Sequence, residues 1–269
     1  MSYPEQEQVP QILIGTSGYS YPDWQGVFYP ADLPRDRWLD HYCREFPFSE
    51  LNFSYYRMPG VKQMERFAAA DTRFVVKAHK SLTHERTHPE DSAALFLESV
   101  APLIQDHKLS AVLMQFPFSF QYTPENRRYL DTALERFHDV PVAVEFRHAN
   151  WLRPSVYEGL RERSAALVAT DAPQVQGGMP PIQEVTADLA YIRFHGRNHE
   201  NWWGGDNVSR YDYDYSEEEL REWLPRITEM AQRSQTVYIS FNNHARGQAI
   251  HNARMLKRIL REMGVTPVE

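Results

Sequence analysis

The amino-acid sequence predicts a single (β/α)8 barrel, the TIM-barrel architecture of the α/β class. Eight short apolar and β-branched runs recur along the chain, and most of them precede a longer helical pattern. Strands that alternate with helices form a parallel sheet, because a parallel connection needs a crossover segment. The length of 269 residues also agrees with the roughly 250 residues typical of this barrel.

The first half of the chain contains four predicted strands separated by helical patterns. Thr123 and Pro124 mark the clearest helix start, because threonine caps a helix N-terminus and proline fits the first turn. The predicted strands are Ile12–Ser17, Phe48–Ser54, Phe74–His79 and Leu109–Phe116, and the predicted helices between them are Arg35–Phe46, Val61–Ala70 and Pro89–Gln105.

The second half continues the alternation with four more predicted strands. A helix is expected after Pro154, and Ser216 with Glu219 forms a capping-box pattern at the start of another. The connection Pro173–Pro181, rich in proline and glycine, follows the sixth strand. The predicted strands are Pro141–Arg147, Ala165–Asp171, Leu189–Gly196 and Thr236–Asn243, and the closing helix is Ala245–Met263.

An open, doubly wound sheet is the main alternative architecture. Such a sheet usually carries a glycine-rich phosphate loop after an early strand. The segment Gly15–Gly18 does not have the G-x-G-x-x-G spacing, and no linker or repeat divides the chain. We therefore expect one barrel domain over residues 11–269, preceded by a flexible N-terminus over residues 1–10.

The composition excludes several classes of protein. With 42% hydrophobic and 13% aromatic residues, the chain has too much apolar surface to remain disordered. A formal net charge of −7 argues against a protein that coats nucleic acid through a broad basic surface. One cysteine excludes a disulfide scaffold, and no apolar run reaches the ~18 residues of a membrane helix. We therefore expect a cytoplasmic protein with no membrane partner.

Polar side chains gather near the C-terminal ends of nearly all the predicted strands. Alternate residues of a strand face the same side, and the active sites of barrels lie at this end. Lys77 and His79 share a face, as do Glu145 and Arg147. The candidate residues at the strand ends are Asn52, Lys77, His79, Gln115, Glu145, Arg147, Asp171, Arg193, His195 and Asn242.

The charges of this set indicate an anionic ligand. Lys77, Arg147 and Arg193 are expected to face Glu145 and Asp171, so that three cations meet two anions. Buried ions persist only when they are paired or hydrogen-bonded. The set is therefore either a structural ion network or a pocket in which the three cations bind an anionic substrate, and we favour the pocket.

Four residues of the set are candidate catalytic groups. Glu145 or Asp171 would act as a base or hold a metal ion, and His79 or His195 would transfer protons near neutral pH. The alternative for both histidines is a hydrogen-bonded place in the core. The sequence identifies no cofactor, and a divalent metal is compatible with these side chains because metal ligands need not be close in sequence.

Neutral and aromatic side chains complete the candidate substrate site. Asn52, Gln115 and Asn242 would orient the substrate through hydrogen bonds. Tyr19 and Trp151 belong to a larger set of aromatic residues in the loops that follow the strands. Such rings either stack on a base or a sugar, or pack the rim of the barrel.

The segment from His84 to His88 matches the H-E-x-x-H pattern of zinc proteases. That chemistry requires a helix, so that both histidines lie one turn apart on the same face. Pro89 follows His88 and disfavours helical dihedral angles at that histidine. We therefore do not interpret this segment as a zinc-protease site.

Ordered blocks of sequence carry a family resemblance over nearly the whole chain. They are Ile14–Tyr21, Trp24 with Phe28–Pro30, Glu50–Pro59, Phe74–Ala78, Leu82–His84, Gln115–Pro117, Glu145–His148 with Trp151, Arg193–Arg197 and Phe241–Asn243. Together they resemble the YecE-like family, known as domain of unknown function 72. The resemblance implies a TIM barrel of uncharacterised activity, with a distant architectural likeness to endonuclease-IV-type barrels. The chain lacks the run of His, Asp and Glu ligands expected of their trinuclear zinc site.

Three functional hypotheses follow from these observations. The first is an enzyme that acts on a small anionic, phosphorylated substrate at the barrel mouth, with phosphoester hydrolysis as the leading reaction. The second is a non-catalytic protein that binds the phosphates of a nucleotide or of single-stranded nucleic acid. The third is a metal-independent isomerase or lyase acting on a sugar acid or sugar phosphate.

Overall fold

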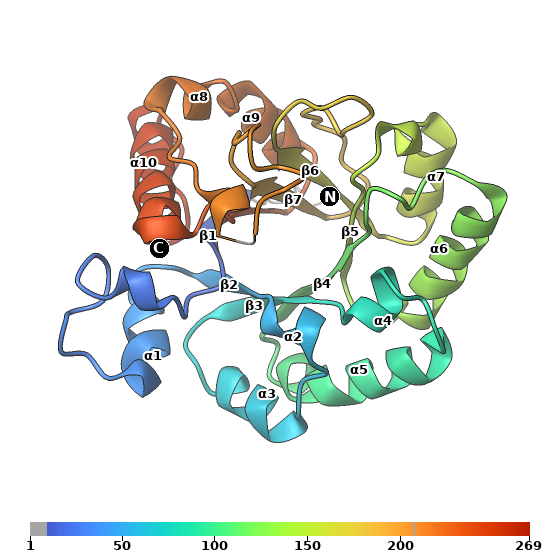
Figure 1. Cartoon of the computed structure of the whole chain (residues 1–269), viewed down its shortest axis with the longest axis horizontal. Helices are drawn as coiled ribbons and strands as arrows, with labels where there is room; N and C mark the ends of the chain where they lie inside the picture. The colour runs from blue at the N-terminus through green and yellow to red at the C-terminus, as the bar shows by residue number, and fades with distance from the viewer. Residues whose placement is uncertain (1–9, 207) are drawn as a thin grey trace, which may run out of the picture.

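The strands form a closed barrel in the computed structural model, which describes residues 10–206 and 208–269. Each strand pairs in parallel with the next, and β1 (Gln11–Ser17) pairs with β8 (Thr236–Phe241) to close the sheet (Figure 1). This closure confirms the predicted (β/α)8 barrel and excludes an open sheet. The flexible N-terminus predicted over residues 1–10 lies, apart from Pro10, outside the described residues.

The other strands lie close to their predicted positions. The second strand is shorter than predicted and ends at Leu51, because the chain turns at Asn52 into a short helix. The strands between β1 and β8 are β2 (Phe48–Leu51), β3 (Arg73–Lys77), β4 (Leu109–Gln115), β5 (Val142–Glu145), β6 (Ala166–Asp171) and β7 (Leu189–Phe194).

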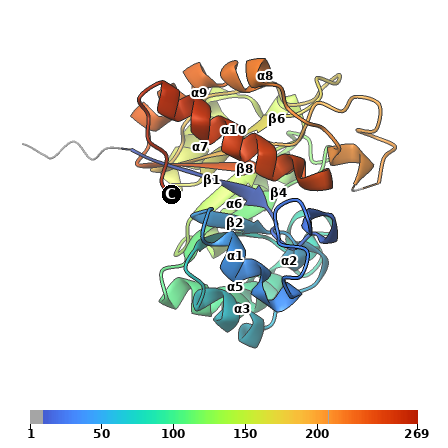
Figure 2. The ribbon, with the colours of Figure 1, turned by 90° about the vertical axis from the view of Figure 1, so that its left-hand side faces the viewer.

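Helices cover the outside of the barrel on every side that Figures 1 and 2 show. The predicted caps are present: Thr123 accepts a hydrogen bond from the Asn126 backbone at 3.3 Å, and Ser216 forms a capping box with Glu219. The α-helices are α1 (Trp38–Tyr42), α2 (Phe53–Tyr56), α3 (Val61–Ala68), α4 (Lys80–Thr83), α5 (Pro89–Gln105), α6 (Pro124–Arg136), α7 (Pro154–Glu162), α8 (Glu217–Arg221), α9 (Leu224–Gln232) and α10 (Gln248–Glu262), and the 3-10 turns are η1 (Pro22–Trp24), η2 (Arg35–Arg37), η3 (Ala149–Trp151), η4 (Ser209–Tyr211) and η5 (Ala245–Gly247).

The outer faces of the strands pack against the helices in two apolar clusters. One cluster joins β3, β4 and β5 to helices α3 to α7, with Phe96 and Leu134 among its buried side chains. The other joins β1, β7 and β8 to helices α8 to α10, with Ile227 and Leu256 at its centre. Burying a side chain of this size stabilises the fold by about 1.5–3 kcal/mol. The packed helices and strands therefore hold the strand ends in fixed positions.

The interior of the barrel has an apolar layer beneath a polar layer. Along each strand the interior face changes from apolar to polar within two residues: Glu50 follows Phe48, and Arg193 follows Tyr191. The polar layer therefore lies at the end where the strands finish. The apolar layer consists of Leu13, Phe48, Val75, Ala111, Leu113, Ala143, Ala166, Val168, Tyr191 and Tyr238.

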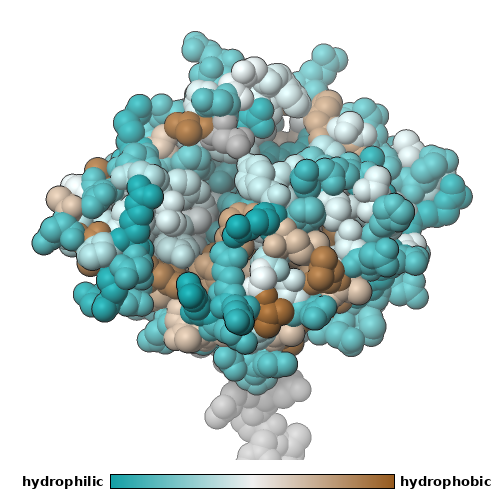
Figure 3. Space-filling model, turned by 60° about the horizontal axis from the view of Figure 1, so that its bottom comes forward, coloured by the Kyte–Doolittle hydropathy of each residue, from teal (hydrophilic) through white to brown (hydrophobic). Residues whose placement is uncertain are grey.

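The long loop between β7 and α8, orange in Figure 1, lies across the end of the barrel at which the strands finish. The face beside α3 and α5 is mostly hydrophilic, and its apolar residues form small separate groups (Figure 3). Within the described residues, each helix is too short or too polar to cross a membrane. The exposed large apolar side chains of the described residues include Val61 on α3, Leu95 on α5 and Trp203 in the long loop.

Gly15 allows β1 and β2 to approach closely, and this contact gives a first prediction. A Cβ atom at position 15 would lie 2.2 Å from the backbone oxygen of Phe48. Because the clash involves backbone in a closed barrel, Gly15→Ala should lower the free energy of unfolding by about 3 kcal/mol, the upper end of overpacking costs. The matched control is Gly204→Ala, whose Cβ meets no atom within 4 Å. Equal stability of the two variants in urea unfolding would contradict this account.

Candidate functional site

A buried arginine joins two buried glutamates inside the barrel. Arg193 on β7 donates from Nε to Glu50 Oε2 at 2.8 Å and from Nη2 to Glu50 Oε1 at 2.6 Å. Its Nη1 atom donates to Glu145 on β5. The three side chains are at most 1% exposed, so this bridge spans the barrel interior away from water.

Tyr191 and Arg147 complete this network. The Tyr191 hydroxyl donates to Glu50, and Arg147 Nε lies 2.8 Å from Glu145 Oε1. Each glutamate is therefore held by at least one arginine. Without these partners, the buried carboxylates would carry a desolvation cost of several kcal/mol each. This part of the polar layer is a paired ion network.

The carboxylates of Glu50 and Glu145 are both ionised, and both are engaged in ion pairs with arginines. Burial raises the pKa of Glu50, but the Arg193 guanidinium outweighs burial and lowers this pKa below its ordinary value. Burial also raises the pKa of Glu145, but Arg147 and Arg193 outweigh it and hold this pKa well below its ordinary value. Because both groups keep their charge in tight ion pairs, neither is a free general base in this arrangement.

His195 is a neutral ring between two fixed partners. Its Nδ1 atom lies 3.1 Å from Asn242 Nδ2, and its Nε2 atom lies 3.3 Å from Glu145 Oε1. Nε2 also lies 3.4 Å from Arg193 Nη1. We assign the ring proton to Nε2, because this tautomer lets Nδ1 accept from the Asn242 amide and gives the closer Glu145 carboxylate a donor. Burial, followed by repulsion from Arg147, lowers the pKa of His195 to about 3. The ring thus positions Glu145 and stays uncharged at neutral pH.

Lys77 differs from the other cations, because no carboxylate of the described residues lies within ion-pair distance of it. Its Nζ atom donates to Gln115 Oε1 at 2.8 Å and lies 4.6 Å from the centre of the Tyr55 ring. Burial, followed by repulsion from Arg193, lowers the pKa of Lys77 to about 7. The neighbouring ring of His84 packs against Tyr55, and burial lowers its pKa to about 4.

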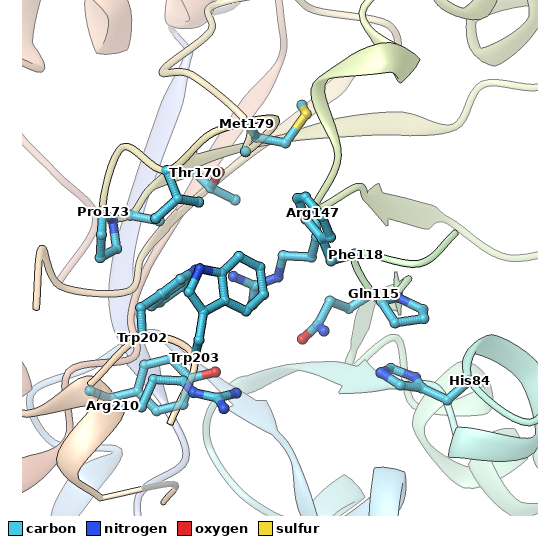
Figure 4. A pocket seen from close by; sticks show the side chains of 15 residues that line it. His84, Gln115, Phe118, Arg147, Thr170, Pro173, Met179, Trp202, Trp203 and Arg210 are labelled. Carbon is cyan, nitrogen blue, oxygen red and sulfur yellow. The ribbon is translucent and has the colours of Figure 1, made fainter. Parts of the chain in front are cut away.

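A cavity of about 210 Å³ opens at the mouth of the barrel. Arg147, Gln115 and His84 point toward its centre, and Trp202, Trp203 and Arg210 approach from the long loop (Figure 4). The lining residues are His84, Gln115, Pro117, Phe118, Arg147, Thr170, Ala172, Pro173, Val175, Gly178, Met179, Trp202, Trp203, Arg210 and Tyr211.

The cavity lining has two arginines and, among the described residues, neither aspartate nor glutamate. Arg147 pairs with Glu145 through Nε, and its guanidinium lies 5.4 Å from the centre of the Trp202 ring. The Nε atom of Arg210 is buried and has no hydrogen-bond partner in the described part of the chain. A buried donor without an acceptor costs about 1–3 kcal/mol. The lining therefore carries positive charge and unused donors.

Asp171 does not join the polar interior, which corrects the sequence prediction. Thr170 is the residue of β6 that lines the cavity, so Asp171 points to the opposite face, among the helices. Its carboxylate accepts hydrogen bonds from Trp223 Nε1 at 2.6 Å, Tyr215 hydroxyl at 2.7 Å and Arg197 Nη2 at 2.8 Å. Asp171 therefore anchors both ends of the long loop that carries the cavity's tryptophans.

Trp151 and Tyr19 also lie outside the cavity lining. Trp151 is 1% exposed and stacks on Phe146 with ring centres 4.3 Å apart, so it packs behind β5. The Tyr19 ring contacts Tyr42 and Phe67 at the rim. For these two aromatic residues the structure matches the rim-packing alternative.

The remaining candidates divide into two groups. His79 caps α4, with Nδ1 accepting from the Ser81 backbone at 3.3 Å, and Asn52 lies before α2 with a buried Oδ1 that has no partner among the described residues. Neither lines the cavity. The structure does bring together Lys77, Gln115, Glu145, Arg147, Arg193, His195 and Asn242. Of these seven, Gln115 and Arg147 line the cavity.

Two important residues were not predicted from the sequence. Glu50 shares the interior face of the second strand with Phe48, and the alternation of that strand was a sufficient signal to find it. Arg210 lies in a long irregular loop, where no periodicity marks which side chains turn toward the barrel.

No cluster of three or more His, Cys, Asp or Glu side chains in the described part of the chain is placed to hold a metal ion. The H-E-x-x-H segment is not a helix: α4 ends at Thr83, and Arg86 and His88 have left-handed φ values of 53° and 47°. The two histidines therefore do not lie one helical turn apart.

The sequence profile of the family described as "Protein of unknown function DUF72" matches residues 13–268. The chain belongs to the DUF72 family. This finding confirms the resemblance to the YecE-like family, which is the same family under another name. A relative, the UPF0759 protein YunF of Bacillus subtilis, is 31% identical over an alignment that covers 93% of this chain and 94% of YunF.

Solved structures of DUF72 proteins have the same fold. A Thermotoga maritima member is 38% identical, with a TM-score of 0.85 over 93% of this chain and 99% of its own. An Enterococcus faecalis member is 28% identical, with a TM-score of 0.81 over 95% of this chain and 99% of its own. These similarities establish the DUF72 family and its barrel, whereas the reaction has to be inferred from the site.

The Arg193 network predicts a large difference between two glutamate substitutions. Glu50→Gln leaves the buried Arg193 guanidinium without one of its two carboxylates, and breaking a buried pair typically costs about 3–5 kcal/mol. Glu45→Gln removes a partially exposed partner of Arg254 and should cost less than about 1 kcal/mol. Urea unfolding of the two variants measures the difference. Similar losses would show that Arg193 does not depend on Glu50.

Proposed function

We propose that this DUF72 protein is an enzyme that binds a small organic anion in the cavity at the barrel mouth and acts on it by proton transfer. The observation that supports this most directly is the cavity lining, which has Arg147 and Arg210 but no carboxylate among the described residues. Arg147 shares Glu145 with Arg193, and Arg210 has no ion pair among the described residues, so the lining keeps guanidinium donors for an anion.

The donor groups of the two arginines match an anion with two or more oxygens. The ion pair of Arg147 uses Nε, which leaves its terminal nitrogens directed to the cavity (Figure 4). Arg210 has a buried Nε without a partner in the described residues. A carboxylate or phosphate accepts paired N–H bonds from a guanidinium, and such charge-assisted bonds are stronger than neutral ones.

Aromatic rings form the wall opposite Gln115. Trp203 packs edge-on against Phe118 with ring centres 5.0 Å apart, and Trp202 lies under the Arg147 guanidinium. Trp203 is 59% exposed, although a tryptophan side chain is buried for the most part in a typical folded protein. A ligand with an apolar or ring-shaped body would bury this surface while its anionic group binds the arginines.

Lys77 supports proton transfer better than the groups expected from the sequence. Glu145 and His195 are held in fixed hydrogen bonds, whereas the amine of Lys77 donates to Gln115, lies over the Tyr55 ring and has no ion pair within the described residues. A proton-transfer group is most effective when its pKa lies near the working pH. The pKa of Lys77, about 7, meets this condition.

The size of the cavity supports a small-molecule substrate more than it supports binding of a nucleic-acid strand. A cavity of about 210 Å³ lies below the roughly 300–1,000 Å³ of sites for drug-sized ligands, so it favours a small molecule over a nucleic-acid strand. Phosphoester hydrolysis, the leading hypothesis from the sequence, gains no separate support from the arrangement of side chains. A base beside an anion clamp instead favours the isomerase or lyase class.

Calorimetric titration tests the anion site with ribose 5-phosphate, glycerol 3-phosphate, glucuronate and pyruvate. At least one of these anions should bind, and Arg210→Gln should weaken it by about 10- to 100-fold, because a charged hydrogen bond contributes roughly 1.5–3 kcal/mol. Arg147→Gln should have an effect of similar size. The control, Arg128→Gln, changes an exposed arginine on α6 and should leave affinity unchanged.

Absence of binding by all four anions, or equal affinity in Arg210→Gln and Arg128→Gln, would contradict the proposed site. Arg210 is the more informative of the two lining arginines, since its replacement breaks no ion pair in the described structure. A folded Arg210→Gln variant with full affinity would therefore be decisive.

Proton transfer is tested by deuterium exchange. An anion that binds and carries a C–H bond next to a carbonyl group should exchange that hydrogen in D2O when the protein is present, as followed by NMR. Lys77→Met should lower the exchange rate at least tenfold, since it removes the proton acceptor while keeping an unbranched side chain. Undiminished exchange in Lys77→Met would exclude Lys77 as the proton-transfer group.

A further inference from the structure

We infer that Lys77 forms a covalent imine with a carbonyl group of the anion bound at the barrel mouth, which makes small oxo acids and oxo phosphates the substrate class. The inference rests on the proposed anion site and gives Lys77 a covalent role there, in which its imine activates the neighbouring C–H or C–C bond and its free amine is no longer the proton acceptor. It is carried by the surroundings of Lys77, by the absence of an ion pair to its amine within the described residues, and by its contact with a residue that lines the cavity.

The surroundings of Lys77 are those of a reactive amine rather than of a structural cation. Its Nζ atom has one neutral acceptor, Gln115 Oε1, at 2.8 Å, and one aromatic face, the Tyr55 ring. Lys257, which is 4% exposed, offers the contrast within the chain. Its Nζ atom likewise has a neutral acceptor, the Glu45 backbone oxygen at 2.7 Å, and an aromatic face, the Phe46 ring. What Lys257 has in addition is a carboxylate, that of Glu269 at 3.9 Å, as a structural buried lysine does.

Lys77 is not itself a lining residue, but two of its neighbours line the cavity. Gln115, the hydrogen-bond partner of its amine, is a lining residue whose amide points inward (Figure 4). His84, a second lining residue, packs on the same Tyr55 ring, with centres 4.9 Å apart. The amine therefore lies behind the Gln115 side chain, and a ligand group that takes the place of the Gln115 oxygen would contact it.

The strand order places the amine and the anion clamp at a distance that one small molecule can span. Lys77 ends β3, Gln115 ends the adjacent β4, and Arg147 follows the next strand, β5. Adjacent strands lie about 4.8 Å apart, so β3 and β5 are separated by about 10 Å. Two long side chains that approach from these strands can hold the two ends of a compound with three to six carbons.

An imine forms only from an unprotonated amine. A lysine becomes nucleophilic near neutral pH when it is desolvated or placed next to another cation. Both conditions hold here, because burial and then repulsion from Arg193 lower the pKa of Lys77 to about 7. Glu50 and Glu145 act in the opposite direction, but both are already paired with arginines.

The proposed step is balanced without a further reactant. The lone pair of the Lys77 nitrogen attacks the carbonyl carbon, and the electrons of the C=O π bond move to oxygen. Both amine hydrogens then leave with that oxygen as water, and a C=N bond replaces the C=O bond. In its protonated form this imine withdraws electrons from the adjacent C–H or C–C bond, which is the bond that an isomerase or lyase must weaken.

Reductive trapping tests the inference on the full chain. The protein is incubated with glyoxylate or pyruvate as carboxylate probes, or with dihydroxyacetone phosphate as the phosphate probe, and then with cyanoborohydride. Hydride transfer to the C=N carbon converts the imine into a stable secondary amine, which peptide mass spectrometry locates among the five lysines at positions 62, 77, 80, 108 and 257. The probe that labels fastest identifies the anionic group that the site selects.

The expected result is labelling of Lys77 at pH 7.5 at least tenfold faster than of Lys80, whose side chain is 42% exposed. An ordinary lysine with a pKa near 10.4 is only about one-thousandth unprotonated at that pH. Labelling of Lys77 should rise with pH to roughly pH 8 and then level off, whereas Lys80 should keep rising toward pH 10. The charged and titratable groups around the Lys77 amine are Glu50, Tyr55, His84, Glu145, Arg147 and Arg193.

Two variants separate this inference from the proposed function. Arg210→Gln should slow labelling of Lys77 in proportion to its weaker binding of the probe, while Lys80→Arg should leave labelling of Lys77 unchanged. Labelling of Lys77 no faster than of Lys80 overturns the inference. If a probe binds through Arg210 without labelling Lys77, the covalent step is wrong and the anion site stands. If no probe binds or labels, both fail.

Discussion

The mouth of this barrel depends on one buried interaction, the bridge that Arg193 makes between Glu50 and Glu145. The ionised groups are tolerated in the interior because Arg193 and Arg147 together balance the charges of Glu50 and Glu145, and most of their polar atoms have partners. The bridge also determines what the neighbouring residues can do. It fixes Glu145 as the partner of Arg147 and His195, and it leaves Lys77 next to a positive charge without a carboxylate of its own in the described structure.

A second anchor, on the outside of the strands, builds the other half of the cavity. Asp171 binds Arg197, Tyr215 and Trp223, so that the long loop between β7 and α8 is tied to the barrel wall. This loop brings Trp202, Trp203 and Arg210 over the strand ends. The strands therefore contribute the titratable side chains of the polar layer, and the loop covers them with cationic and aromatic side chains. The combination explains how a chain with a net charge of −7 can present a locally cationic cavity.

Sequence reasoning predicted the barrel and much of the polar layer, because both follow from local periodicity. The two-residue alternation of strands correctly placed Lys77, Arg193 and Glu145 on the interior face. It failed where the register between strands decides the outcome. Thr170 lies opposite Arg193 in the β6–β7 pairing, so Asp171 turns outward although it ends its strand. Arg210 could not be predicted, since the fold of its loop depends on tertiary contacts rather than on a repeating pattern.

We propose that the mouth of the barrel holds an organic anion between Arg147 and Arg210. A crystal structure of the protein with its tightest-binding anion tests this claim most directly. We expect anion oxygens within hydrogen-bond distance of the terminal nitrogens of Arg147 and of the Arg210 guanidinium. The body of the ligand should lie against Trp202 and extend toward Gln115 and Lys77. An anion bound elsewhere on the protein, with both guanidinium groups turned away from it, would contradict the account.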